Sequence, residues 1–395
     1  MTALEFSPYD YRIHEDPYPT YARLRAEAPL YRNDEFDFWA LSRHADVVAT
    51  FRNLDVFSNA NGVSLDPSAY GPHAHRTMSL LATDPPLHTR MRSIVSRTFT
   101  PRRIAALEPR IREITLEHLE PALDGGAFDF IDDLAGRIPM DVISELVGVP
   151  TEDRVELRRL ADLLVHREEG TYDVTPQGFE AAIALFGYYD DLMRDRRANP
   201  RDDLTSELLA DEVDGDRLSD EEIAAFLFLL VVAGNETTTK LLGNAWYWAW
   251  ANPDERAKPF ADRERIHDWV EETLRYDGST QMVLRTVKAP VTLHGVDLDA
   301  GERVFLLIGS ANRDERVFDR PADYDLDRVT SDLLAFGSGR HFCLGALLAR
   351  LEARAVLDEL LVRIADYDID MARAARVHSA NVRGFATLPT TVVAR

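Results

Sequence analysis

Cysteine is almost absent from this chain of 395 residues, which contains only Cys343. One thiol cannot form a disulfide within the chain, and a multi-cysteine zinc site or a protein-bound iron–sulfur cluster needs more. Basic residues are outnumbered, and the resulting formal net charge of −23 argues against nucleic acid as a partner. Because a single cysteine cannot hold an iron–sulfur cluster, any electrons that redox chemistry needs must come from another protein.

Long apolar runs are absent as well. The longest, residues 223–233, is shorter than the roughly 20 residues that span a bilayer, and residues 1–16 lack the apolar core of a signal peptide. We therefore expect neither a signal peptide nor a membrane anchor, and we expect a cytoplasmic protein. Residues 202–222 hold ten carboxylates and one basic residue, Arg217, which is typical of a solvated loop and helix edge.

Apolar residues make up 45% of the chain, enough for a substantial core, and no Gly/Ser-rich linker divides it. We predict one domain over residues 1–395 that is mainly α with a small β portion. The β-rich parts are expected near residues 30–42, 283–307 and 367–393. Helices are expected at residues 16–28, 43–52, 86–99, 104–123, 134–147, 152–167, 178–196, 219–250, 265–276 and 346–364.

One predicted helix is unusually long. Ser219 and Glu222 form a capping-box pattern, and the Pro-free stretch that follows runs to about residue 250. Few globular helices reach this length, so we expect it to cross the whole molecule. Residues 53–83, by contrast, carry many Gly, Pro, Asn and Ser residues without a period, and a loop of this length inside a domain is usually functional.

Cys343 lies in the segment FGSGRHFCLG, directly before the helix predicted at residues 346–364. Gly337 and Gly339 permit tight turns with positive φ, which let a loop fold its amides toward a sulfur atom. Unpaired N–H groups and the positive dipole end at a helix start favour a thiolate over a thiol. The segment therefore predicts a thiolate ligand for iron. The alternative for a lone cysteine is simple packing in the core.

Two flanking residues support the same interpretation. Gly345 removes a side chain where a flat ligand would approach the backbone closely, and Phe336 supplies an aromatic wall. The segment fits the pattern Phe-x-x-Gly-x-(Arg/His)-x-Cys-x-Gly, and on these residues the chain resembles the cytochrome P-450 superfamily of haem-thiolate monooxygenases. The resemblance implies that Cys343 is the axial ligand of a haem b iron, beneath a long central helix. It extends from DPYP at residues 16–19 to RGF at residues 383–385.

Gly234 interrupts the apolar run of the long helix and precedes Glu236 and Thr237. Glycine inside a helix costs about 1 kcal/mol relative to alanine, so it needs a reason. Local widening of the helix beside a ligand site is one reason; the alternative is a helix emerging into solvent, with Thr237 bonding to a carbonyl one turn earlier. The resemblance implies that Glu236 and Thr237 are the acid and the alcohol that deliver protons during oxygen activation.

Glu272 and Arg275 lie three residues apart on a predicted helix, which alone is an ordinary surface pair. The resemblance implies a structural role instead, in which the pair ties this helix through Arg328 to the loop before the cysteine segment. We interpret the three residues as scaffold for the haem pocket.

His88 and Arg92 are four residues apart and share a helix face. In isolation this pattern is also typical of a basic solvated stripe. The resemblance implies that both, with Arg285 and His341, bind the two haem propionates, a task that suits charge-assisted pairing to arginine.

The resemblance also implies a substrate pocket with a mostly apolar lining. The sequence departs from many relatives at GSTQ, residues 278–281, where they carry a Ser-Pro pair, and at Asn235, where His is commoner. A macrolide, a steroid, a terpene and a fatty acid all remain possible substrates. The pocket residues implied are Leu80, Leu81, Leu230, Ala233, Met282, Val283 and Phe385.

Together these features predict a monooxygenase that inserts one oxygen atom from O2 into an apolar small molecule. Electrons are expected from a ferredoxin and an NAD(P)H-dependent ferredoxin reductase, docking on arginines within residues 84–103 and 336–354. One rival is a peroxide-driven fatty-acid hydroxylase or decarboxylase of the same fold, although such relatives replace the acid–alcohol pair. The other is a non-catalytic haem sensor, which would not need that pair.

Overall fold

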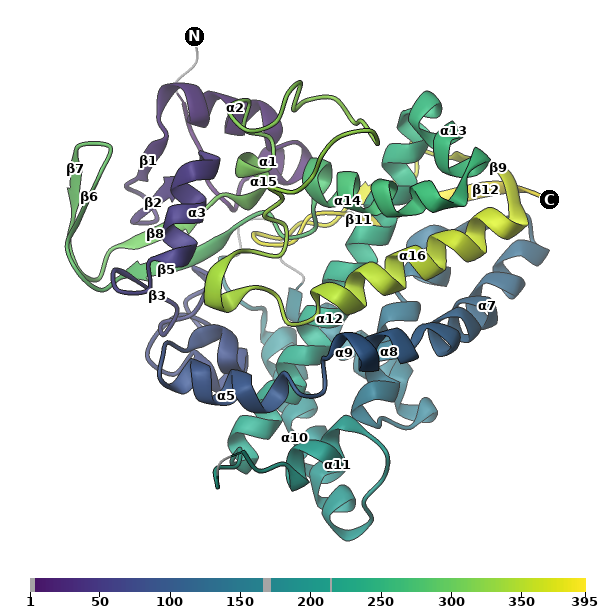
Figure 1. Ribbon diagram of the computed structural model, residues 1–395, viewed down its shortest axis with the longest axis horizontal. Helices are drawn as coiled ribbons and strands as arrows, with labels where there is room; N and C mark the ends of the chain where they lie inside the picture. Colours follow the sequence, from purple (N-terminus) through teal and green to yellow (C-terminus); the bar gives the residue numbers. More distant parts are fainter. Residues whose placement is uncertain (1–3, 166–171, 214) are drawn as a thin grey trace.

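The computed structural model describes residues 4–165, 172–213 and 215–395, and helices dominate it (Figure 1). The molecule is mainly α with a small sheet portion, as predicted. The helices are α1 Tyr11–Glu15, α2 Tyr18–Glu27, α3 His44–Arg52, α4 His75–Met78, α5 Leu87–Val95, α6 Pro101–Ala106, α7 Glu108–Asp124, α8 Ile138–Val147, α9 Arg154–Val165, α10 Pro176–Ala198, α11 Leu204–Ala210, α12 Asp220–Ala251, α13 Pro253–Ala261, α14 Ile266–Asp277, α15 Ile308–Ala311 and α16 Ala346–Arg363.

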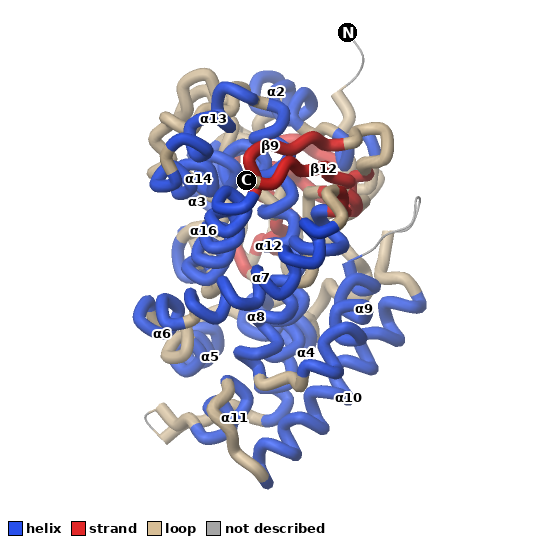
Figure 2. The backbone as a smooth tube through the Cα atoms, turned by 90° about the vertical axis from the view of Figure 1, so that its right-hand side faces the viewer, coloured by secondary structure: helices blue, strands red, loops and turns tan. Residues whose placement is uncertain are grey.

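The strands of the described residues form four small sheets. The largest has the order β1-β2-β8-β5-β3, in which β2 and β8 are parallel and the other neighbours antiparallel. Figure 2 shows the strands in the upper half of the molecule and α10 and α11 at its lower end. The strands are β1 Leu30–Asn33, β2 Phe38–Leu41, β3 Phe57–Ser58, β4 Ala127–Asp129, β5 Val283–Val287, β6 Val291–Leu293, β7 Val296–Leu298, β8 Arg303–Leu306, β9 Ile364–Ile369, β10 Ala375–Arg376, β11 Phe385–Thr387 and β12 Pro389–Ala394.

Helix α12 passes through the centre of the molecule (Figure 1). Its start has the predicted capping box: Ser219 Oγ accepts from the Glu222 amide at 3.2 Å, and the Glu222 carboxylate accepts from the Ser219 amide at 2.8 Å. Among the described helices α12 alone is long and apolar enough to cross a bilayer, and 67% of its most apolar stretch is buried inside the protein. It packs against α8, α14 and α16 and so forms the core around which the site is built.

Several predicted helices differ from the observed ones. The helix expected at 104–123 is broken at Leu107 into α6 and α7, and the one expected at 134–147 is replaced by a π-helical turn, Phe130–Ala135, followed by α8. Helices α11 and α13 were not predicted. The first lies in the acidic stretch, and the second contains Pro259. Residues 166–167, the end of another predicted helix, lie outside the described residues.

Candidate active site

A cavity with about 300 Å³ of space for the centres of water molecules lies beneath α12. It is bounded by α12 and by the N-terminal half of α16 with the loop before it. Residues of the long loop 53–83 and of β5 line the other sides. The predicted residues that line it are Leu80, Leu81, Arg92, Leu230, Ala233, Thr237, Val283, Arg285, Phe336, His341, Cys343 and Gly345.

The loop before α16 presents the thiol of Cys343 to this cavity. Gly337 and Gly339 have φ values of 71° and 74°, in the left-handed region that favours glycine. A Cβ at Gly339 would lie 3.0 Å from the carbonyl oxygen of Phe51, so the loop also needs glycine there to pack against α3. The Cys343 amide donates to the Phe336 carbonyl at 3.0 Å, which closes the turn.

Burial and nearby polar groups have opposite effects on the pKa of the Cys343 thiol. Burial raises the pKa of the thiol, while the backbone amides of Gly345 and Ala346 and the cations Arg92 and Arg350 act to lower it. Gly345 is the N-cap of α16, so these amides are the unpaired donors of a helix start, as the sequence predicted. Cys343 is exposed because the cavity in front of it admits water-sized molecules, so the sulfur is open to a ligand on that side.

Phe336 forms part of the wall beside the sulfur, and the guanidinium of Arg350 lies 4.4 Å from the centre of its ring. Glu271 on α14 holds that guanidinium in place, with Arg350 Nε 2.6 Å from Glu271 Oε1. The aromatic wall is therefore fixed by a cation that is itself paired.

Two cations, the buried Arg285 and the half-buried Arg92, line the cavity, and neither forms an ion pair with a carboxylate of the described residues. Arg285 on β5 is 3% exposed, and its side chain donates to the carbonyl of the adjacent Leu284 at 2.7 Å. Burial lowers the pKa of Arg285 to about 10, the shift expected of a desolvated cation lacking a counter-charge. Arg92 also lines the cavity, and burial lowers its pKa as well.

Two histidines complete this group. The rings of His88 and His341 lie 4.0 Å apart, and both ring nitrogens of His88 and Nε2 of His341 are buried without a hydrogen-bond partner among the described residues. Burial lowers the pKa of His88 to about 4, with Arg92 adding to the effect. It lowers the pKa of His341 to about 2, with His88 next in effect. His341 lines the cavity, whereas His88 lies behind it.

These features fit a haem. Orphaned buried donors and unpaired cations suit two carboxylates, such as the propionates, and a sulfur that faces the same cavity suits the iron. The residues that would hold the group are Cys343, Arg92, Arg285, His88 and His341.

Thr237 and the residues around it form the α12 side of the cavity, where Ala233, Gly234 and Thr238 also line it. Helix α12 stays α-helical through Gly234, and Thr237 Oγ1 donates to the Ala233 carbonyl at 2.7 Å. This is the local bond that the sequence left as an alternative to widening. The Thr237 carbonyl in turn accepts from Ser279 Oγ at 2.6 Å, which ties this turn of the helix to the segment before β5.

Glu236 does not line the cavity. It is 5% exposed, and its carboxylate pairs with Lys240 Nζ at 3.2 Å one turn along α12. It also hydrogen-bonds to the carboxyl of Asp162 on α9. The predicted acid and alcohol are therefore adjacent in sequence but point to different sides of the helix.

The three predicted scaffold residues meet in the structure. Glu272 and Arg275 are both almost fully buried and pair at 2.6 Å, and Arg328 Nε lies 3.3 Å from the same Glu272 oxygen. Arg275 also donates to the carbonyls of Asn312, Pro321 and Asp323 at 3.0–3.1 Å. The trio therefore ties α14 to the segment that leads to the cysteine loop.

Two predicted pocket residues are wrong. Met282 is 3% exposed and packs with Leu284 in a cluster on the far side of β5, because successive strand residues point to opposite faces and Val283 takes the cavity side. Phe385 on β11 is 2% exposed, and the centre of its ring lies 4.8 Å from the centre of the Tyr247 ring, away from the cavity.

Sequence reasoning also missed part of the lining, because these residues lie in elements whose inward faces only the fold defines. They are Phe51, Val63, Phe99, Ile143, Phe226, Leu229, Leu241, Leu274, Ser279, Thr280, Ile308, Leu348 and Glu352.

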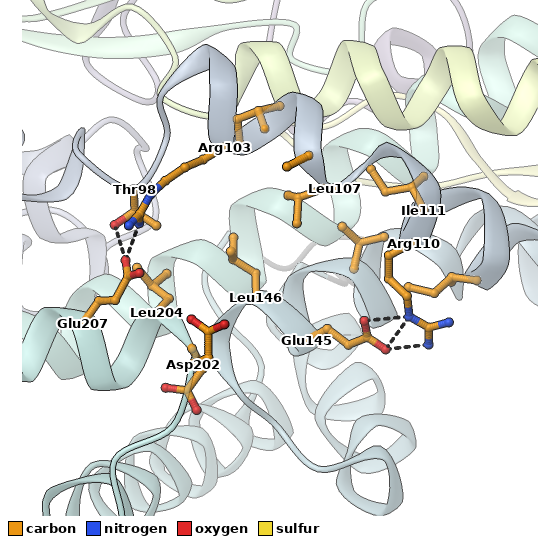
Figure 3. Close-up of a pocket in the computed structure, with 15 residues that line it drawn as sticks. Thr98, Arg103, Leu107, Arg110, Ile111, Glu145, Leu146, Asp202, Leu204 and Glu207 are labelled. Atoms are coloured by element: carbon orange, nitrogen blue, oxygen red, sulfur yellow. Dashed lines mark hydrogen bonds and ion pairs between the residues drawn. The ribbon is translucent and has the colours of Figure 1, made fainter.

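A second cavity of about 390 Å³ lies between α6, α7, α8 and α11, and no predicted site residue lines it (Figure 3). At one end Arg103 pairs with Glu207 at 2.5 Å. At the other end Arg110 pairs with Glu145 at 2.6 Å. The sticks of Figure 3 show apolar side chains between these pairs. Its charged residues are thus mostly satisfied by one another.

The mainly helical fold and a single thiol that faces an apolar cavity, beside cations that pair with no described carboxylate, fit the class of haem-thiolate proteins. A family model described as Cytochrome P-450 matches residues 264–364. Cytochrome P-450 123 of Mycobacterium tuberculosis is 58% identical over 393 residues, 99% of this chain and 98% of that protein. The vitamin D(3) 25-hydroxylase of Pseudonocardia autotrophica is 38% identical over 385 residues, 96% and 94% of the two chains.

Solved structures agree with these relatives. The crystal structure of CYP109E1 from Bacillus megaterium in complex with corticosterone superimposes with a TM-score of 0.86 at 33% identity, covering 96% of this chain and 99% of that one. The chain belongs to the cytochrome P-450 superfamily and is a haem-dependent monooxygenase of the bacterial type. Enzymes of this family use redox partners and apolar substrates.

Proposed function

We propose that this enzyme binds haem b through Cys343 and inserts one oxygen atom from O2 into a neutral apolar molecule. The observation that carries the proposal is the thiol facing a mostly apolar cavity beside unpaired cations. When bound, a haem with a thiolate ligand supplies the chemistry that cleaves O2 and transfers one of its atoms. The protein supplies the ligand, the pocket and the protons.

Each residue group has a separate task in this proposal. Arg92, Arg285 and His341 bind the propionates, and His88 supports His341 from behind. Thr237 presents its hydroxyl on the cavity side of α12, and Glu236, one residue earlier in the chain, accepts protons and passes them on. The alcohol is thus within the cavity, while the acid lies where it can exchange protons with groups outside it.

The lining favours a neutral substrate. The part contributed by α12 carries no cation: it consists of Phe226, Leu229, Leu230, Ala233, Gly234, Thr237, Thr238 and Leu241. A free fatty acid would need a cation there to bind its carboxylate close to the reacting centre. Among the substrate classes considered, we favour a steroid, since one relative is named a vitamin D(3) 25-hydroxylase and a structural neighbour was crystallised with corticosterone. Ser279 and Thr280 would orient it through hydroxyl contacts.

The same lining argues against the peroxide-driven rival, because that activity needs a substrate carboxylate bound above the haem. A non-catalytic sensor is disfavoured by Thr237, whose hydroxyl faces the cavity.

We further propose that a ferredoxin, reduced by an NAD(P)H-dependent reductase, docks near the start of α16 in a cytoplasmic setting. Phe342 and Leu347 are 44% and 45% exposed there. The exposed Arg102 and Arg354 lie on α6 and α16, which pack together, and the exposed Arg340 lies in the loop before α16. Arg90 and Arg103, which were expected to add positive charge to the docking surface, instead form ion pairs with carboxylates of this chain. Arg90 pairs with Asp216 at 2.5 Å and with Glu222 at 2.7 Å. Arg103 pairs with Glu207.

The test uses purified holoenzyme with a surrogate ferredoxin, its reductase, NADPH and a set of steroids. Under 18O2 we expect a product that carries one labelled oxygen atom and forms only when NADPH is present. Product that forms from peroxide alone, or oxygen that comes from water, would overturn the proposed reaction. Free fatty acids serve as the matched substrate control, and their methyl esters separate loss of charge from loss of fit.

A further inference from the structure

Glu236 belongs to a small cluster of charged groups between α9 and α12. Its carboxylate pairs with Lys240 at 3.2 Å and hydrogen-bonds to the Asp162 carboxyl. Arg158, one turn before Asp162 on α9, approaches that carboxyl at 3.9 Å and also lies 3.5 Å from Asp132. Lys240 lies flat against Gly384, where an added Cβ would come within 2.5 Å of the Lys240 side chain. The lysine is therefore confined to the Glu236 side.

Exposure changes sharply across this cluster. The side chains of Glu236 and Lys240 are 7% and 6% exposed, whereas that of Asp162 is 49% exposed. Asp162 is therefore the member that meets water, and Glu236 is the member that adjoins Thr237 in the chain. A proton that moves from solvent to the buried Glu236 can therefore pass through Asp162.

Two carboxyl groups in hydrogen-bond contact cannot both be ionised without strong repulsion, so the pair retains one proton. The ammonium of Lys240 touches Glu236 and not Asp162, which puts the negative charge on Glu236 and the proton on Asp162. We propose that Asp162 is the solvent-side positioning residue of the proton path, holding a proton against Glu236 and transferring it to that carboxylate, which then passes it inward. The proton comes from water, and Asp162 is reprotonated by water, so no other reactant is needed.

The proposal rests on the proposed monooxygenase function and deepens its proton delivery. Although half of the Asp162 side chain is exposed, the protein packed around its other half removes water from the carboxyl. This partial burial, with Glu236 next in effect, raises the pKa of Asp162 to about 7, while Arg158 and Lys240 oppose the rise. As the pH rises through about 7, Asp162 loses its proton and the shared hydrogen bond breaks. We therefore expect product formed per NADPH to fall over the same range.

The first test needs no turnover. Infrared difference spectra of the holoenzyme on either side of about pH 7 should show a protonated carboxyl that disappears as the pH rises. Asp162→Asn should remove this signal, and Glu236→Gln should lower its midpoint in part, because burial, the larger cause of the raised pKa, remains. The control Glu156→Gln, an exposed acid on α9 that pairs with Arg159, should leave the signal unchanged. A signal that survives in Asp162→Asn would overturn the proposal.

The second test is the pH profile of coupling. Asp162→Asn keeps a neutral hydrogen-bond donor to Glu236 but cannot carry a proton. We expect several-fold less product per NADPH, the loss of the decline near pH 7, and unchanged substrate affinity. An active Asp162→Asn enzyme with the wild-type profile would refute the role of Asp162 and leave the proposed function intact. A wild-type holoenzyme that forms no oxygenated product would instead refute the proposed function, while the infrared signal would still report on the pair.

Discussion

The Thr237 hydroxyl lies on the cavity side of α12 and already donates to the Ala233 carbonyl at 2.7 Å. Because it can also accept a hydrogen bond, it can hold a proton donor in the cavity. We predict that Thr237→Ala binds haem and substrate normally but diverts reducing equivalents to peroxide, so product per NADPH falls. Parallel assays of NADPH consumed, product and peroxide would check this.

A matched control exists on α7. Thr115 Oγ1 donates to the Ile111 carbonyl at 2.7 Å, the same local bond, but it lies in the core and lines neither cavity. Thr115→Ala should leave coupling unchanged. If the two variants uncouple equally, the effect of Thr237 comes from the helix and not from proton delivery.

Asp277 is a buried carboxylate that several groups hold in place. Arg383 and Tyr18 approach one oxygen at 2.6 Å each, and Trp248 donates to the other at 2.8 Å. Arg376 lies 3.5 Å away. We predict that Asp277→Asn lowers the free energy of unfolding by about 3 kcal/mol, because it leaves buried arginines without their counter-charge. Urea unfolding at neutral pH measures this.

The pH dependence of this contribution has a definite sign. Burial alone would raise the pKa of Asp277, but Arg383 and Arg376 outweigh it and hold the pKa well below its usual range. The stabilisation is therefore full above the unfolded value of about 3.9 and is lost only as the pH falls through the lower folded pKa. Asp191→Asn, at an exposed pair with Arg194, is the control and should have a negligible effect. Equal losses in both variants would contradict the account.

At the scale of elements, Arg275 joins α14 to the segment before the cysteine loop. Its guanidinium is fully buried, pairs with Glu272 at 2.6 Å and donates to three backbone carbonyls. Lysine cannot reproduce this planar set of bonds. We predict that Arg275→Lys destabilises the protein by about 3–5 kcal/mol and lowers the haem retained after purification. Unfolding curves and the ratio of haem to protein absorbance would check both effects.

The control lies in the same segment. Arg320 is 62% exposed and pairs with Asp323 and Asp325 at 3.1 and 2.9 Å. Arg320→Lys should keep both stability and haem, because exposed pairs contribute little. Normal haem content in Arg275→Lys would show that the pair does not support the site.

The sequence predicted elements well where a local signal marks their ends. The capping box at Ser219 marked the start of α12, and β5, Val283–Val287, begins the β-rich part predicted near residues 283–307. The sequence predictions were wrong where the local residue pattern indicates a different element from the one observed. Pro259 lies inside α13, and the apolar pattern continues across the break at Leu107. There tertiary packing overrides local preference.

The site was predicted in the same uneven way. A loop motif carries Cys343 and its glycines, so spacing alone was informative. Strand alternation decides between Met282 and Val283, but the cavity face is defined only by the folded sheet. Asp162 could not be found from sequence, because nothing in the pattern links α9 with Glu236.

At the scale of the whole molecule, a net charge of −23 coexists with exposed arginines near the start of α16. No described carboxylate pairs with Arg102 or Arg340, unlike Arg103. We predict that Arg102→Glu with Arg340→Glu slows reduction by a ferredoxin and flattens its salt dependence, since steering acts over a Debye length of about 8 Å. Stopped-flow reduction at several salt concentrations measures this.

Substrate affinity should not change in this double variant. Arg159→Glu with Arg194→Glu, two exposed arginines outside residues 84–103 and 336–354, provides a control of equal charge change. Reduction rates that respond to neither pair, and not to salt, would move the docking surface elsewhere.

The central claim is that the thiolate of Cys343 holds the iron. The most direct measurement is the absorption spectrum of the reduced protein with carbon monoxide, recorded for the wild type and for Cys343→Ser. We predict the red-shifted Soret band of thiolate ligation in the wild type and its loss in the variant, even where the variant keeps haem. A folded Cys343→Ser protein with the wild-type band, or a wild type without it, would contradict the claim.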